Sequence, residues 1–163
     1  MCKRKVAVIG VGNLLMGDEG VGIAVVRRLE KVVISDELEI IDAGTSFFTM
    51  VSELRRFQKV IIVDAVHGRE APGSVYRFTM EDVEGKKDSV LSLHDFGVFE
   101  SIRLERLIAP MPEEIIFYGV EPLSVRLTMQ LSPTLQEKVG YVVQKIIEEL
   151  KESGICIKEI HTE

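Results

Sequence analysis

Three short runs of the chain are apolar or aromatic at every position, and this feature restricts the fold more than any other. The runs are residues 6–9, 60–63 and 115–118. A strand without polar positions has no face for water, so it belongs in a sheet whose two faces are both covered. Segments with apolar residues at helical spacing separate these runs. The alternation predicts a three-layer α/β/α sandwich around a twisted, mostly parallel sheet.

The remaining elements complete this fold class. A strand is predicted at 38–41, and the alternation of apolar and polar residues over 74–80 predicts one antiparallel edge strand. Helices are predicted over 18–31, 47–56, 95–109 and 132–153. Their expected start signals are an N-cap at Asp18, a Thr45 or Ser46 cap, a capping box from Ser92 to Asp95, and Ser132 followed by Pro133.

Apolar spacing also predicts the buried face of two helices. In the 95–109 helix the expected core positions are Phe96, Phe99, Leu107 and Ile108. In the last helix the expected core stripe consists of Leu135, Val139, Val142, Val143, Ile146, Ile147 and Leu150. We expect residues 150–163 to include a loose tail or a short edge strand.

Length, charge and cysteine content limit the functional classes. The 163 residues fit one domain over 1–163. A net charge of −6 and scattered basic residues argue against nucleic acid as a partner. No segment is long and apolar enough to predict a membrane-spanning helix. Cys2 and Cys156 lie near opposite ends and form no metal or disulfide motif, which indicates a reducing, cytoplasmic location.

Polar residues follow the predicted parallel strands, where ligands of open α/β sheets bind. They include Glu19 after the first strand, the 42–45 segment after the second, Asp64 after the third, and His94 before the third helix. The sequence therefore predicts a cleft that is rich in carboxylates and contains one imidazole.

Each of these residues has a structural and a functional interpretation. Glu19 either complements a helix dipole or acts in the cleft, and Asp64 either caps local backbone amides or serves as a ligand or base. His94 is a candidate ligand or base, whereas His67 is expected to be solvated and His161 inert. Two carboxylates and one imidazole could bind a borderline divalent metal ion with open positions, or could activate water without metal. The residues alone leave both chemistries open.

A dinucleotide site is disfavoured. Gly10 and Gly12 fit the first half of a GxGxxG motif, but Leu15 occupies the position of the third glycine. Asp18 and Glu19 would also repel a pyrophosphate from the start of the following helix.

Five ordered motifs resemble the nickel–iron hydrogenase maturation proteases. They are GVGNLLMGDEGVG from residue 10, DAGT from 42, VDA from 63, SLH from 92, and GVEP from 119 followed by LSP from 131. The resemblance covers the chain from Val6 to about residue 150. Two departures are Glu121, where glutamine is frequent, and Ala43, where glycine is frequent. We expect Glu121 to add negative charge near the cleft.

The resemblance implies an activity and a site. Family members remove a C-terminal extension from the precursor of the hydrogenase large subunit after nickel has been inserted. Glu19, Asp64 and His94 match the family's metal-contacting residues, so the nickel carried by the precursor would be the recognition element. The cofactor expected is therefore nickel on the substrate rather than a metal held tightly by the free enzyme. The alternatives are an assembly chaperone that binds the loaded precursor without cutting it, and an unrelated hydrolase or nucleotide enzyme on the same sheet.

Overall fold

A five-stranded sheet forms the centre of the computed structural model, which describes residues 5–84 and 93–161. The strand order is β3-β1-β4-β6-β5. Four strands are parallel, and β5 pairs with β6 in the antiparallel direction. The strands are β1 (Val6–Val11), β3 (Leu38–Gly44), β4 (Lys59–Ala65), β5 (Val75–Thr79) and β6 (Glu114–Val120). The mostly parallel sheet with one antiparallel edge strand confirms the predicted fold class.

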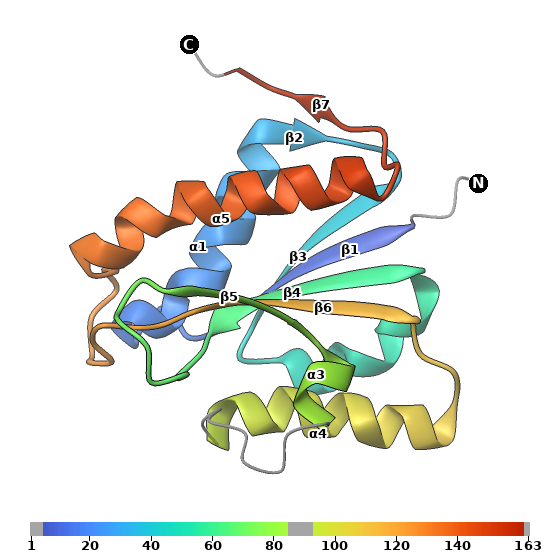
Figure 1. Ribbon diagram of the computed structural model, residues 1–163, viewed down its shortest axis with the longest axis horizontal. Coiled ribbons are helices and arrows are strands. Elements are labelled where there is room, and N and C mark those ends of the chain that lie inside the picture. Colours follow the sequence, from blue (N-terminus) through green and yellow to red (C-terminus); the bar gives the residue numbers. More distant parts are fainter. Residues whose placement is uncertain (1–4, 85–92, 162–163) are drawn as a thin grey trace.

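Helices cover both faces of this sheet, as Figure 1 shows. On one face lie α1 (Val21–Val32) and α5 (Pro133–Glu152), and on the other lie α2 (Phe47–Met50), the 3-10 helix η2 (Val51–Arg56) and α4 (Leu93–Ile108). A short helix, α3 (Met80–Glu84), follows β5. The sheet therefore has a separate hydrophobic core on each face. Strand β4 is apolar and buried from Val60 to Val63 because it lies at the centre of the sheet.

Two predicted helices are divided in the structure. The 18–31 segment forms a 3-10 turn, η1 (Gly17–Gly20), before α1 begins, and the residue at the N-cap of α1 is Gly20. The predicted N-cap role of Asp18 is therefore wrong. The 47–56 segment divides into α2 and η2, and the Ser46 side chain makes no capping hydrogen bond.

The predicted core positions of α4 are partly wrong. Phe99 is buried, but Leu107 and Ile108 are 83% and 76% exposed. The buried stripe contains Phe99 and Ile102, and its helical spacing reaches Arg106 next. Leu107 and Ile108 consequently turn away from the sheet. The predicted Ser92–Asp95 capping box and the Phe96 side chain lie outside the described part of the chain.

The start of α5 matches its prediction. Ser132 is the N-cap, its side chain accepts a hydrogen bond from the Leu135 amide, and Pro133 is in the first turn. All seven predicted core positions of α5 are buried. The helix ends at Glu152, one residue before the predicted end. After it, β7 (Lys158–Glu159) pairs in the antiparallel direction with β2 (Val33–Ile34), so the end of the chain includes a short edge strand.

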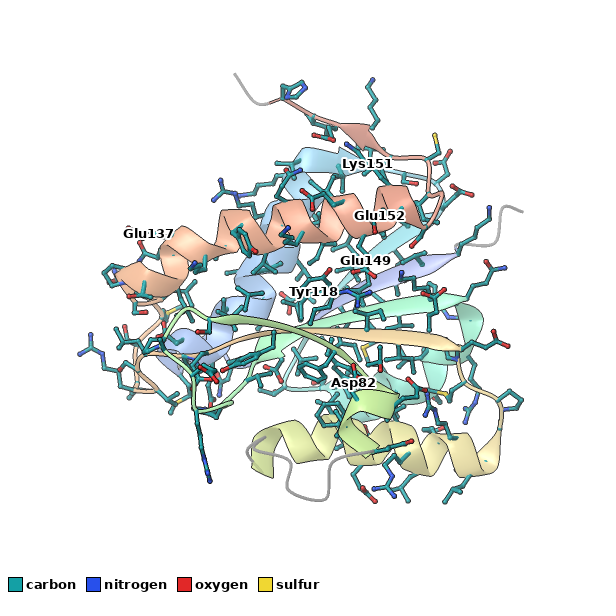
Figure 2. All side chains as sticks on the ribbon, viewed as in Figure 1. Asp82, Tyr118, Glu137, Glu149, Lys151 and Glu152 are labelled. Atoms are coloured by element: carbon teal, nitrogen blue, oxygen red, sulfur yellow. The ribbon has the colours of Figure 1, made fainter. Side chains whose placement is uncertain are left out.

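A buried ionic network attaches α5 to the sheet. Figure 2 shows Glu149 and Tyr118 close together between α5 and the strands. The Glu149 carboxylate accepts hydrogen bonds from Lys59, Arg77 and the Tyr118 hydroxyl. Burial alone would raise the pKa of Glu149, but these donors and the charge of Lys59 lower it to about 2. Glu149 is therefore ionised in the interior and has three partners on three different strands.

Candidate active-site cleft

An open cleft of about 250 Å³ lies at the carboxyl ends of β1, β3 and β4. Backbone and side chains from four separate segments line it. The lining residues are Val11, Gly12, Asn13, Glu19, Gly44, Thr45, Phe47, Phe48, Asp64, Ala65, His67 and Val98. The structure thus has a cleft at the predicted position, after the ends of the parallel strands.

Glu19 reaches this cleft because the chain folds back tightly after β1. The Asn13 amide donates to the Glu19 carbonyl oxygen at 3.2 Å, and the Gly12 amide donates to the Gly44 carbonyl oxygen at 2.9 Å. A Cβ atom on Gly12 would lie 2.0 Å from the Glu19 carbonyl oxygen, so only glycine permits this approach. The Glu19 side chain is half-buried at the cleft.

Asp64 is the second carboxylate of the cleft. It lies near the end of β4, opposite Gly119 in the β4–β6 register, and is half-buried. One carboxylate oxygen accepts a hydrogen bond of 2.8 Å from the Ala65 amide. The strand is buried up to Val63, so the carboxylate emerges where the sheet meets the cleft. The structure therefore places Glu19 and Asp64, from different elements, in one cavity.

His94 is placed only by its backbone. It lies in the first turn of α4, and its side chain is outside the described part of the chain. Val98, four residues later on the same helix, lines the cleft. Residues four apart share one face of a helix. No group of three or more His, Cys, Asp and Glu residues arranged to hold a metal ion occurs within the described residues, which do not include this side chain.

His67 is a cleft residue that sequence reasoning missed. We expected it to be solvated in a polar turn, but it is half-buried and lines the same cavity as Glu19 and Asp64. The available signal was its position, three residues beyond Asp64 at the carboxyl end of a buried strand. His161, in contrast, is exposed in the tail.

Asp18, next to the cleft residue Glu19, has a different role from the cap that we predicted. Its side chain is fully buried. The carboxylate accepts hydrogen bonds from the amides of Leu123, Ser124 and Ser132 at 2.7 to 3.0 Å, and from the Ser132 hydroxyl at 2.8 Å. Burial alone would raise the pKa of Asp18, but these donors lower it below its usual range. Asp18 therefore anchors the loop between β6 and α5.

Glu121 does not add charge to the cleft as expected. Its side chain is 7% exposed and is absent from the residues that line the cavity. It accepts hydrogen bonds from the Gly68 amide at 2.6 Å and the Tyr76 hydroxyl at 2.7 Å. Because a carboxylate can accept from several donors at once, Glu121 joins the loop after β4 to β5. Glu121 is a structural residue.

The cleft combines carboxylates and an imidazole with an apolar part of its lining. Carboxylate and imidazole groups are ligands of borderline metal ions, but Glu19, Asp64 and His67 do not form a three-ligand group within the described residues. Apolar walls from Phe47, Phe48 and Val98 restrict water around these groups. A carboxylate in such surroundings can also act as a general base toward water.

Comparison with known proteins gives one consistent family. Residues 23–149 match the family model described as hydrogenase maturation protease. Hydrogenase 2 maturation protease of Escherichia coli is 28% identical over 153 residues, which span 93% of each chain.

Solved structures agree with this match. The hydrogenase-maturating endopeptidase HybD from Escherichia coli superposes with a TM-score of 0.84 at 29% identity, covering 95% of this chain and 97% of that one. Hydrogenase 2 maturation peptidase from a Thaumarchaeota archaeon superposes with a TM-score of 0.71 at 29% identity, covering 90% and 98%. The similarity therefore includes nearly the whole chain.

Proposed function

The chain belongs to the hydrogenase maturation protease family, and we propose that it is the cytoplasmic endopeptidase that removes the C-terminal extension of a nickel–iron hydrogenase large-subunit precursor. The observation that carries this proposal is the meeting of Glu19 and Asp64 in one open cleft at the carboxyl ends of the strands. A cleft of this kind admits an extended chain, whereas a closed cavity would not.

The nickel of the precursor is the recognition element in this proposal. Glu19, Asp64 and His94 complete the coordination of that nickel and bring the scissile bond into the cleft. Support comes from the carboxylate pair of the cavity and from the place of His94 on α4, one turn before the cleft residue Val98. Because the metal arrives with the substrate, a precursor without nickel offers these ligands nothing to bind.

Water is the attacking group in the proposed hydrolysis. No Ser or Cys in the sequence lies in a GxSxG nucleophile elbow. A carboxylate of the cleft takes the proton from water as the water oxygen attacks the scissile carbonyl carbon, or the metal lowers the pKa of that water. The C–N bond then breaks, the amine leaves with a proton, and the new carboxylate remains on the large subunit.

The deciding experiment compares nickel-loaded and nickel-free precursors on incubation with the protein, with the product mass as readout. We expect shortening of the loaded precursor only. Glu19→Gln and Asp64→Asn should each reduce the cleavage rate at least about a hundredfold, as is common for lost acid–base groups. Glu30→Gln, at an exposed glutamate of α1, the helix that follows the Glu19 turn, is the matched control and should cleave normally. Binding of the loaded precursor without any cleavage would overturn the protease assignment in favour of an assembly chaperone.

A further inference from the structure

The loop between β6 and α5 exposes large apolar side chains in a regular pattern. Leu123, Val125, Leu127 and Met129 alternate with polar residues and are 54%, 40%, 83% and 72% exposed. In a half-buried extended segment the apolar positions normally face the protein and the polar positions face water. Here the apolar positions face outward. Clustered exposed apolar side chains of this kind mark binding surfaces.

This loop is held rigidly although it contains no helix or strand of its own. The buried Asp18 carboxylate accepts four hydrogen bonds from it. Backbone hydrogen bonds add to the anchor: Thr128 donates to the Leu15 carbonyl oxygen at 3.0 Å and Gly17 donates to the Thr128 carbonyl oxygen at 2.8 Å. A surface fixed in advance loses little conformational entropy when a partner binds.

The loop lies beside a segment that lines the cleft. The 12–19 segment lines the cavity through Gly12, Asn13 and Glu19, and the same segment carries Leu15, which is 54% exposed. Met16 forms a parallel bridge with Thr128, so Leu15 lies beside the loop. Figure 1 shows this loop next to the beginning of α1. The exposed side chains of the loop therefore lie near the segment that brings Glu19 to the cleft.

We propose that Leu15, Leu123, Val125, Leu127 and Met129 form a docking ridge for an extended apolar segment of the precursor polypeptide. This inference rests on the proposed function. The occupant is a polypeptide because the loop pairs with the segment that brings Glu19 to the proposed cleavage cleft. The ridge supplies apolar contact area for binding, and the cleft ligands distinguish a nickel-loaded precursor from one without nickel.

The test uses two double variants with closely matched exposure. Leu127→Ser with Met129→Ser removes two ridge side chains, and Leu107→Ser with Ile108→Ser removes two side chains of α4 that are 83% and 76% exposed. Affinity for the nickel-loaded precursor is measured by calorimetry with each protein, and cleavage is measured separately. The ridge variant should raise Kd and KM about tenfold or more with kcat and Tm unchanged, and the α4 control should match the wild type.

Two results would overturn the ridge. Equal precursor affinity for the ridge variant and the α4 control would show that these side chains carry no docking energy. A wild-type dimer by light scattering that the ridge substitutions convert to monomer, with precursor affinity unchanged, would assign the surface to a second copy. The binding measurement does not depend on cleavage, so a wild-type protein that binds through the ridge but cuts nothing would refute the protease proposal and leave the ridge standing.

Discussion

Two neighbouring carboxylates in the chain have opposite surroundings. Asp18 is fully buried and accepts four hydrogen bonds from a distant loop, whereas Glu19 is half-buried in the cleft. Adjacent residues in a 3-10 turn point in different directions, so one turn can serve both roles. The residue that holds the loop and the carboxylate that lines the cleft are therefore fixed by the same short segment.

Replacing Asp18 should affect stability strongly. Asp18→Ala leaves three backbone amides and the Ser132 hydroxyl without their acceptor, and we expect the free energy of unfolding to fall by about 3 kcal/mol. Urea unfolding measures the change. Asp36→Ala, at an exposed position, is the control and should change stability by less than about 0.5 kcal/mol. A fall no larger than that of the control would show that water replaces the carboxylate without cost.

At the scale of elements, α1 approaches the sheet closely at Gly22. A Cβ atom there would lie 2.2 Å from the Val63 carbonyl oxygen and 2.5 Å from the Val11 carbonyl oxygen. Backbone atoms cannot rotate away as side chains can, so helix and strands would have to separate. This contact sets the distance between the turn that carries Glu19 and the strand that carries Asp64.

Gly22→Ala should therefore damage both stability and catalysis. We expect Tm to fall by several degrees and cleavage to fall beyond what the loss of folded protein explains, because the two carboxylates move apart. Thermal unfolding and single-turnover cleavage provide the readouts. Gly140→Ala in α5 is the control, because its Cβ would meet nothing closer than 3.8 Å. That variant should be unchanged or up to about 1 kcal/mol more stable. Normal cleavage by Gly22→Ala would contradict the positioning role.

The five strands of the main sheet, the start of α5 and the position of the cleft followed from the sequence, because they depend on local patterns of residues. The role of Asp18 did not, since its partners are more than a hundred residues away. The exposure of Leu107 was also not predicted, because the buried stripe of α4 passes through Arg106 rather than through an apolar residue. The structural role of Glu121, which was expected to add charge near the cleft, was missed because its partners Gly68 and Tyr76 lie 53 and 45 residues away in the chain. Contacts between distant segments, rather than local patterns, decide such positions.

For the whole molecule, acid should act mainly through the network around Glu149. The folded-state pKa of about 2 lies below the ordinary value of 4.5, so this carboxylate stabilises the fold fully above about pH 4.5. The contribution is lost as pH falls from 4.5 toward 2, because the unfolded chain then binds the proton first. Glu149 joins α5 to Lys59, Arg77 and Tyr118 of the sheet. The packing of α5 on the sheet should therefore weaken as the pH falls from 4.5 toward 2.

Glu149→Gln should show this dependence directly. At pH 7 we expect a loss of about 3 kcal/mol, because Lys59 and Arg77 keep their charges without the buried partner. The difference from wild type should shrink between pH 4.5 and pH 2. Urea unfolding at several pH values measures it, with the exposed Glu148→Gln as the control. A difference that does not depend on pH would contradict the depressed pKa.

Within the described chain, none of the helices is long and apolar enough to cross a bilayer. The two regions proposed to act on the precursor share one anchor, the Asp18–Glu19 turn. One region is the carboxylate cleft, and the other is the apolar ridge.

The Asp18 anchor has a consequence for how such enzymes diversify. The carboxylate accepts hydrogen bonds from the backbone amides of residues 123 and 124 and from the amide and hydroxyl of Ser132. The outward side chains at 125, 127 and 129 take no part in these hydrogen bonds. Substitutions at those three positions therefore leave the anchor of the loop intact. We therefore expect the loop to be exchangeable between relatives. Such an exchange offers a route to directing the same hydrolytic centre to a different substrate protein.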